Sequence, residues 1–341
     1  MRSAHWICGC LLIVAAATSV HAAAFFVDAD LGDDSNPGTS AASPFATIQR
    51  AIDEAGDVPG PDMIHIACGE YEENLAIDDP DKLTLAGSGA SLVTAADPDE
   101  HVIEIDGGDV TISNLEVAGG DDGIRADDMV SLTVRNVVVT GNADEGLQAG
   151  NVENVKISNS TFSENEGDGV NLEEVDVATI NGITLLENDD GIDIEASGEI
   201  HVTQLTACGN LDEGFEVDDT ASVVIVGGTV SGNYDDGLDL DDTQSVRLVS
   251  VVSTGNVGNG LQIEAEEDFD TEVLTVVNGV FSENGEDGIK VVELGAVVHR
   301  VGLTNISARE NVESGLDIDI SGSVKLARVI SEDNGEDDIL P

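Results

Sequence analysis

Carboxylates gather in one short stretch of this chain in a way that could bind cations. The sequence "NYDDGLDLDD", residues 233–242, holds five carboxylates in ten residues and no Lys or Arg. Carboxylates this close either raise one another's pKa or recruit cations. Ca²⁺ suits such a group, because it takes about six to eight oxygen ligands, carboxylates included. The first chemistry that the sequence predicts is therefore Ca²⁺ binding.

The same pattern recurs along the chain and indicates a solenoid. Related units are "GNADEGLQ" (141–148), "GNLDEGFE" (209–216), "GNVGNGLQ" (255–262) and "ENVESGLD" (310–317). Their glycines are Gly123, Gly146, Gly169, Gly191, Gly214, Gly237, Gly260, Gly288 and Gly315, which are 22–23 residues apart except for two longer steps of 28 and 27. Such a period marks a repeat architecture.

Within each period, apolar residues alternate with polar ones, which is typical of strands. Coils of 22–23 residues with tight Asn/Gly/Asp turns predict an all-β fold, a parallel β-helix solenoid. A leucine-rich repeat is excluded by the Leu spacing. We expect the repeated glycine to adopt a positive φ at a corner, and the Asn four residues before it to stack into a structural ladder.

The solenoid would place equivalent residues of successive coils roughly 4.8 Å apart, in columns. One outward column holds Arg125, Gln148, Asn171, Asp193, Glu216, Asp239, Gln262, Lys290 and Asp317. The next runs from Asp127 through Asp241 to Asp319. We predict that Asp193, Glu216 and Asp239 bind Ca²⁺, with help from Asp236 or Asp241. The alternative is a solvated acidic face balanced by diffuse counterions. Zinc is not expected, because no His or Cys cluster occurs.

Composition limits the partners of the chain. Asp and Glu number 69 against 12 Lys plus Arg, a net charge of -57 in 341 residues. No basic patch can therefore neutralise a nucleic acid, and an anionic membrane surface is disfavoured for the same reason. Disorder is excluded, because 41% of the residues are hydrophobic and spread evenly.

The N-terminal residues 1–22 are typical of a secretory signal, with Arg2, an apolar stretch and a small-residue cleavage site. No later segment is long and apolar enough for membrane insertion. We therefore expect a protein that is secreted, periplasmic or at the cell surface. Cys68 and Cys208 would lie several coils apart, so we expect no disulfide between them.

Residues 23–60 are predicted to form a strand, a loop and a helix with Ser43 as N-cap, Pro44 at its first position and Gly56 after its end. This helix would cover the first open edge of the solenoid, which then occupies residues 61–341. At the other end, Asp338 replaces the repeated glycine. There, either another chain covers the last edge, or acidic residues and Pro341 blunt it.

Several of these segments resemble a known superfamily. The opening "VDADLGDDSNPGTSAASPFATIQRAID", the segment "IHIACGEYEENL" and the repeated N-x-x-D/E-G-hydrophobic units resemble the right-handed parallel β-helix proteins of the pectate-lyase-like superfamily. The resemblance covers nearly all of residues 25–341 and is specific for the fold. The superfamily includes lyases, hydrolases, esterases, epimerases and non-catalytic surface proteins, so function does not follow from it.

In the polysaccharide lyases of that superfamily, Ca²⁺ bridges enzyme and uronate in a groove along this sheet, and a Lys or Arg abstracts the proton. The resemblance thus implies Lys290 and Arg125 as candidate bases. The longer coils add loops at 264–273 and 292–300, where His299 and Arg300 are secondary candidates for catalysis and for substrate binding. Tyr234 is placed to stack on a sugar ring.

Departures from the enzyme motifs favour a non-catalytic interpretation. The Gly-His-Gly and Arg-Ile-Lys strings of pectin hydrolases and the Asp-Pro-His-Glu string of alginate epimerases are absent. We expect a surface- or matrix-associated protein that binds Ca²⁺ and polysaccharide. The alternative is a Ca²⁺-dependent polysaccharide lyase or a related carbohydrate-active enzyme with Lys290 as its base.

Overall fold

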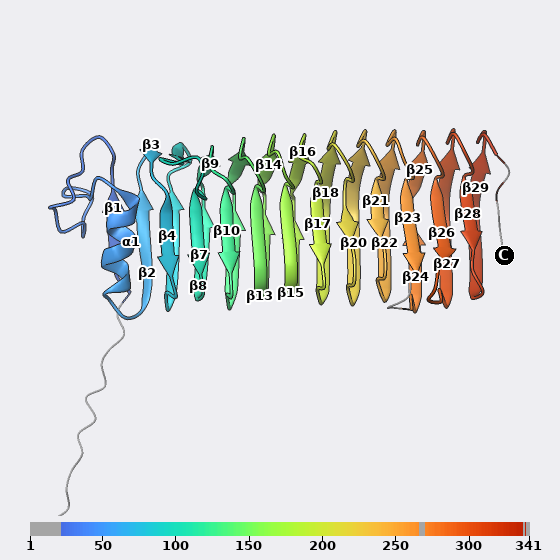
Figure 1. Ribbon diagram of the computed structural model, residues 1–341, viewed down its shortest axis with the longest axis horizontal. Helices are drawn as coiled ribbons and strands as arrows, with labels where there is room; N and C mark the ends of the chain where they lie inside the picture. Colours follow the sequence, from blue (N-terminus) through green and yellow to red (C-terminus); the bar gives the residue numbers. More distant parts are fainter. Residues whose placement is uncertain (1–21, 266–269, 337, 339–341) are drawn as a thin grey trace, which may run out of the picture.

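The chain winds into stacked coils whose strands are all parallel to their neighbours in the next coil. A computed structural model describes residues 22–265, 270–336 and 338. Figure 1 shows the coils side by side along the long axis of the molecule, with the one helix at the N-terminal end. The register confirms the period read from the sequence, since Leu238 pairs with Leu261 and Asp239 with Gln262. The fold is the parallel β-helix that the sequence predicts.

Each coil contributes strands to three faces. The first face, which follows the repeated glycines, comprises β4 (Leu75–Asp78), β7 (Ile103–Asp106), β10 (Ile124–Asp127), β17 (Ile192–Glu195), β19 (Glu216–Val217), β21 (Leu238–Leu240), β23 (Leu261–Ala265), β26 (Ile289–Glu293) and β28 (Leu316–Asp319), together with the first residues of β13 (Leu147–Ser158) and β15 (Val170–Asn181).

The second face continues β13 and β15 and adds β2 (Pro61–Ile66), β5 (Lys82–Gly87), β8 (Asp109–Ser113), β11 (Ser131–Arg135), β18 (Glu199–Cys208), β20 (Ser222–Ser231), β22 (Ser245–Thr254), β24 (Val273–Val277), β27 (Arg300–Arg309) and β29 (Ser323–Glu332), with β1 (Ala24–Val27) paired to β2. The third face holds β3 (Gly69–Glu72), β6 (Ser91–Thr94), β9 (Glu116–Ala118), β12 (Val138–Thr140), β14 (Thr161–Ser163), β16 (Thr184–Leu186), β25 (Val280–Ser282) and the ends of β18, β20, β22, β27 and β29.

The core is the interior of the coils. Alternation places Leu238 and Leu240 inside, fully buried, while Asp239 between them faces outward and is partly exposed. Equivalent apolar residues of successive coils pack on one another along the whole solenoid. Burial of this continuous apolar column is the main stabilising contribution to the fold.

A ladder of buried asparagines holds the corner that precedes the first face. The backbone N–H of Asn210 donates to Oδ1 of Asn233 at 3.1 Å, and its side-chain amide donates to the same oxygen at 2.9 Å. Asn233 bonds Asn256 in the same way. This arrangement confirms the structural ladder predicted from the sequence, and it fixes the register of one coil on the next.

The repeated glycines are needed for a different reason from the one predicted. They do not adopt a positive φ, so that prediction was wrong. A Cβ at Gly146 would lie 2.6 Å from the carbonyl oxygen of Gly169 and 2.7 Å from Nδ2 of Asn165. Glycine is therefore required because the ladder and the next coil approach the backbone too closely for any side chain.

The N-terminal helix begins later than predicted. Helix α1 spans Ile48–Gly56 with Thr47 as its N-cap, instead of starting at Ser43 and Pro44, and Gly56 is its last residue. The reason is that Phe45 is extended and pairs with β1, where its side chain is fully buried. The apolar stripe of the helix is buried as predicted, and α1 packs against β1, β2 and β4 at the first edge.

The structure also describes the two cysteines, the longer coils and part of the C-terminal end. Cys68 and Cys208 are both free thiols, as expected. The two longer coils carry extra residues after β23 and β26, where the N–H groups of Leu294 and Gly295 donate to the carbonyl of Ala265. Asp338 accepts hydrogen bonds from Leu316 N–H and Ser331 Oγ. Residues 1–21, which include most of the predicted signal, and Pro341 lie outside the described residues.

Replacing one rung of the ladder should destabilise the solenoid. In Asn233→Ala, the backbone N–H and side-chain amide of Asn210 lose their buried acceptor, so we expect the free energy of unfolding to fall by about 2–3 kcal/mol. Denaturant unfolding followed by circular dichroism measures this. The neighbouring Tyr234→Ala, at an exposed site, should change it by no more than about 0.5 kcal/mol. Equal effects of the two variants would contradict a structural ladder.

Candidate cation-binding site

The structure assembles the predicted outward column on the first face. Glu216 pairs with Asp239, Asp239 with Gln262, Gln262 with Lys290 and Lys290 with Asp317. A bridge between Glu195 and Asp218 aligns the coil of Asp193 with that of Glu216. Residues that are 23 to 28 positions apart in the sequence are therefore direct neighbours on this face.

A second set of acids lies immediately before the repeated glycines, and these acids cap the next coil. Oδ1 of Asp190 accepts from the N–H of Glu213 at 2.7 Å, and Oδ1 of Asp168 accepts from the N–H of Asp190 at 3.1 Å. Asp287 does the same for Ser314 at 2.7 Å. One oxygen of each carboxylate thus satisfies a backbone donor, which gives these acids a structural role. The second oxygen of Asp168 accepts from the amide of Asn171 at 3.2 Å.

One acidic group on the first face contains members of both sets. Asp190, Glu213 and Glu216 each offer a carboxylate oxygen within 4.8 Å of the others. All three side chains are partly buried. A second group, Asp212, Glu213 and Asp235, shares Glu213 at the corner. Sequence analysis named Glu216 but missed Asp190 and Glu213 as ligands; the signal was an acid directly before the glycine in consecutive coils.

Burial and mutual repulsion raise the pKa of these carboxyl groups. Desolvation, followed by the charges of Asp190 and Asp193, raises the pKa of Glu216 to about 8. Desolvation and the charge of Asp168 raise the pKa of Asp193 to about 6. Burial likewise raises the pKa values of Asp190 and Glu213. Without a cation the group therefore holds protons near neutral pH, and a cation would replace them.

The other predicted ligands are already engaged in hydrogen bonds. Asp236 is only 4% exposed and accepts from the N–H of Asn259, while Oδ1 of Asp241 accepts from the N–H of Glu264 at 2.7 Å. Oδ2 of Asp239 accepts from the amide of Gln262 at 3.0 Å. Oδ1 of Asp239 is buried with no hydrogen-bond partner among the described residues. A cation, or a proton on a neighbouring carboxyl, would satisfy it.

Lys290 is held by an ion pair. Its Nζ lies 2.9 Å from Oε1 of Glu264 and donates to Oε1 of Gln262 at 2.8 Å. Burial tends to lower the pKa of Lys290, but the hydrogen bond and charge of Glu264 outweigh it and raise the pKa. A protonated ammonium does not accept a proton, so Lys290 acts here as a cation.

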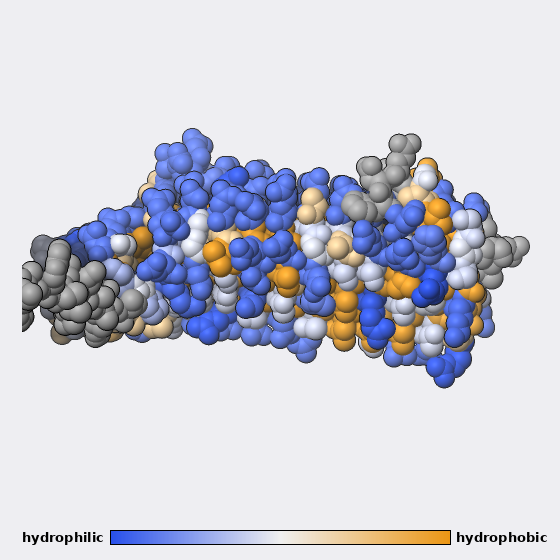
Figure 2. Space-filling model, turned by 90° about the horizontal axis from the view of Figure 1, so that it is seen from below, coloured by the Kyte–Doolittle hydropathy of each residue, from blue (hydrophilic) through white to orange (hydrophobic). Residues whose placement is uncertain are grey.

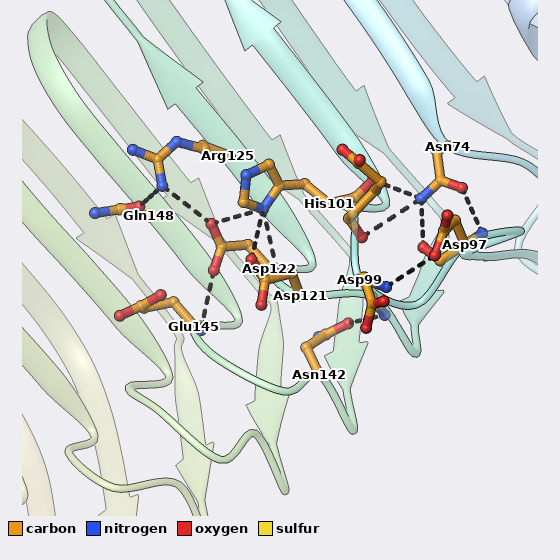
Figure 3. A network of polar contacts seen from close by, with 12 residues as sticks. Asn74, Asp97, Asp99, His101, Asp121, Asp122, Arg125, Asn142, Glu145 and Gln148 are labelled. Carbon is orange, nitrogen blue, oxygen red and sulfur yellow. Dashed lines mark hydrogen bonds and ion pairs between the residues drawn. The ribbon is translucent and has the colours of Figure 1, made fainter.

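Arg125 belongs to a polar network at the first regular coils, which Figure 3 shows from close by. Its guanidinium lies 3.5 Å from Oδ2 of the buried Asp122, its Nε lies 3.0 Å from Asp127, and it also donates to Gln148. Nδ1 of His101 approaches Asp122 Oδ2 from the other side at 3.0 Å. Sequence analysis did not single out His101 or Asp122. The side chains of Arg125 and His101 thus lie on two sides of the buried carboxylate of Asp122.

The middle coils, residues 157–246, have no Lys or Arg that could neutralise their acidic side chains. Residues 157–246 contain 22 Asp and Glu, one His and no Lys or Arg. Among the described residues of the first face, the cations that pair with acids on either side of this segment are Arg125 and Lys290. Within the segment, Nε2 of His201 lies 3.7 Å from Oε2 of Glu199 on the second face. The view from below in Figure 2 is largely hydrophilic, with apolar patches separated by hydrophilic side chains. The group of Asp190, Glu213 and Glu216 thus lies in a segment with no Lys or Arg to neutralise it.

The remaining candidates lie elsewhere. Tyr234 is 64% exposed at the corner before β21, beside the acidic groups. His299 is exposed, with Nε2 3.6 Å from Asp270, and Arg300 is exposed at the start of β27 on the second face. The structure does not bring Arg300 into the column of Lys290. Their catalytic and substrate-binding roles stay predictions.

Comparisons with known proteins support the architecture. Residues 101–245 match the family described as "Right handed beta helix region". A cell surface glycoprotein of Methanothermus fervidus is 29% identical over 92 residues, which are 27% of this chain and 15% of that protein's length. Among the residues that the structure describes, no helix is long and apolar enough to cross a membrane.

Three solved structures share the shape of this chain. The A-module of the Azotobacter vinelandii mannuronan C-5 epimerase AlgE4 is 17% identical, with a TM-score of 0.53 over 86% of this chain and 91% of that one. PfbA, a surface adhesin of Streptococcus pneumoniae, is 12% identical, with a TM-score of 0.56 over 85% and 86%. XylC, solved with xylose, is 9% identical, with a TM-score of 0.63 over 93% and 86%. These likenesses show the fold, a right-handed parallel β-helix.

The raised pKa values predict how stability depends on pH. Each such carboxyl keeps its proton in the folded protein at pH values where the unfolded chain, with a pKa near 4, has released it. The stabilising contribution is therefore complete below about pH 4 and is lost as pH rises through 6 and 8. In low salt with a chelator, the midpoint of thermal unfolding should be lower at about pH 9 than at about pH 6.

Glu216→Gln, which imitates the protonated carboxyl, should reduce this loss. Differential scanning calorimetry of both proteins at the two pH values tests the sign. A midpoint that rises with pH, or a variant with the same pH dependence as the unaltered protein, would contradict the assigned shifts.

Proposed function

We propose that this right-handed parallel β-helix of the pectate-lyase-like superfamily is an exported, surface- or matrix-associated protein that binds Ca²⁺ on its acidic first face and associates with polysaccharide. One observation carries the proposal. In the middle coils, carboxylates from successive coils come within 4.8 Å of one another, in a segment without a single Lys or Arg. Carboxylates so arranged need an external positive charge to ionise together.

The donor set favours Ca²⁺ over softer metals. The acidic groups found among the described residues consist of Asp and Glu only, which are hard oxygen ligands. Asp190, Glu213 and Glu216 would form the centre of the site. The predicted ligands Asp193 and Asp239 flank Glu216 in the same column, and the unpartnered oxygen of Asp239 offers a further ligand.

The comparisons support the location and the class of partner. One relative is named a cell surface glycoprotein, one structural neighbour is a surface adhesin, and two others act on mannuronan or were solved with xylose. A surface role with carbohydrate as a partner fits this set. Because the first face is acidic, a polyuronate would be repelled unless Ca²⁺ bridges the two sets of carboxylates.

Calcium binding should depend on the carboxylates of the column. Isothermal titration calorimetry of Ca²⁺ should show affinity reduced at least about tenfold in Glu216→Gln and in Asp239→Asn. Binding should release protons, because the cation displaces them from groups with raised pKa values. Buffers of different ionisation enthalpy measure that release.

A matched control for this experiment lies in the same part of the solenoid. Glu199 is exposed on the second face and belongs to none of the acidic groups found among the described residues. Glu199→Gln removes the same charge and should leave the isotherm unchanged. If all three variants bind Ca²⁺ as the unaltered protein does, the acids act by diffuse screening and the site is wrong.

A lyase reaction is the second candidate function, and the position of Lys290 supports it. Lys290 lies in the same column as the proposed Ca²⁺ ligands, two coils from Asp239. Its ion pair with Glu264 must open before it can accept a proton. Polymannuronate, polyguluronate and polygalacturonate with Ca²⁺ should therefore give no absorbance from unsaturated products. If such products form and Lys290→Ala abolishes them, the non-catalytic assignment is overturned.

A further inference from the structure

An exposed apolar ridge runs along the corner beside the acidic face. Leu211, Tyr234 and Val257 occupy the same position in three consecutive coils and are 60%, 64% and 60% exposed. The N–H of Tyr234 donates to Asn210 O at 3.1 Å and that of Val257 to Asn233 O at 3.0 Å, which stacks them in a line. In a chain of net charge -57 with 3% aromatic residues, such a line of exposed apolar side chains needs an explanation.

Beside the ridge lies a trough whose base is formed by the backbone of three glycines. Gly209, Gly232 and Gly255 occupy the position just before the ladder asparagines, with φ near 70°, and a Cβ built on any of them would meet nothing within 4 Å. Glu187 and Glu283 hold the same position and the same backbone conformation in other coils. Glycine is thus not required there. Its effect is to leave the surface beside the ridge uncovered.

The trough is a measurable hollow. A volume of about 610 Å³ is lined by residues of three consecutive coils, namely Leu186 and Glu187, then Cys208, Gly209 and Leu211, then Gly232 and Tyr234. Glu187, which holds the glycine position in the coil before Gly209, borders the hollow at that end. Because the lining spans three coils, the hollow suits a short segment of one polymer chain.

Exposed carboxylates border the ridge on its other side. Asp212 and Asp235 directly follow Leu211 and Tyr234, are both exposed, and stack through the N–H of Asp235 and the carbonyl of Asp212 at 3.1 Å. No Lys or Arg occurs between residues 157 and 246 to pair with them. A ligand on the ridge would therefore meet apolar contacts and uncompensated negative charge together.

We propose that the trough and ridge bind a polysaccharide that carries free amino groups, with sugar rings against Tyr234 and ammonium groups beside Asp212 and Asp235. The inference rests on the proposed function in that it names the class of glycan. Tyr supplies an apolar face for a sugar ring, and an ammonium forms charge-assisted hydrogen bonds with a carboxylate. Three side chains in a line are too few for the core of a protein interface, which needs about 1,000 Å² or more.

A hexamer of β-1,4-linked glucosamine is the probe, titrated at low salt and followed by calorimetry and by the NMR signals of Tyr234. Tyr234→Ala should weaken binding about tenfold. Gly232→Glu installs the residue type that other coils carry at this position, so the fold should tolerate it, and it fills the trough. It should also weaken binding by about tenfold or more although it adds negative charge.

Several results would overturn the inference. Attraction by charge alone would make Gly232→Glu bind more tightly and leave Tyr234→Ala unchanged. Equal binding of the N-acetylated hexamer would exclude recognition of amino groups, and equally Tyr234-dependent binding of a lysine hexapeptide would indicate a basic peptide as the partner. Absence of binding would refute it outright.

Controls separate this inference from the calcium proposal. Val312→Ala removes an exposed apolar side chain at the same position of a distant coil, 66% exposed, and should not affect hexamer binding. Glu216→Gln should lose Ca²⁺ affinity and keep hexamer binding, whereas Tyr234→Ala should do the reverse. Loss of both activities in Glu216→Gln would contradict separate sites.

Discussion

The register between coils is the constraint on which the rest of this molecule depends. Parallel pairing brings equivalent residues to roughly 4.8 Å, and the buried asparagine ladder allows no slip, since Asn210 bonds Asn233 through both backbone and side chain. A period of 22–23 residues therefore becomes a column of direct neighbours. Acids such as Glu216 and Asp239, far apart in sequence, must share one wall of the solenoid.

Because the register stacks carboxylates on one another, their repulsion destabilises the folded protein. The structure reduces this repulsion in three ways. Some carboxylates, such as Asp190, cap the backbone of the next coil. Others take protons, as the raised pKa of Glu216 indicates. On either side of the middle coils, Arg125 and Lys290 neutralise their neighbours. The middle coils contain no Lys or Arg, which is why we propose external cations and cationic ligands as partners of this surface.

The sequence predicted the fold and the columns because the period, the alternation and the Asn and Gly positions directly reflect the stacking of the coils. The predictions were wrong where contacts between residues distant in the sequence determine the local structure. Gly146 is glycine because Asn165 and Gly169 crowd it, not because of its φ. The helix starts at Ile48 because Phe45 pairs with β1. The choice of Asp190 and Glu213 depends on which carboxylate oxygens come within 4.8 Å of one another, and the sequence does not reveal side-chain positions.

The central claim is that stacked carboxylates of successive coils hold a cation at a fixed place. Crystals soaked in Ca²⁺ and then in a lanthanide, measured near the lanthanide absorption edge, locate such an ion directly by anomalous scattering. We expect a strong peak among the carboxylate oxygens of Asp190, Glu213 and Glu216. Weak peaks scattered over exposed acids, with none between these three side chains, would contradict it.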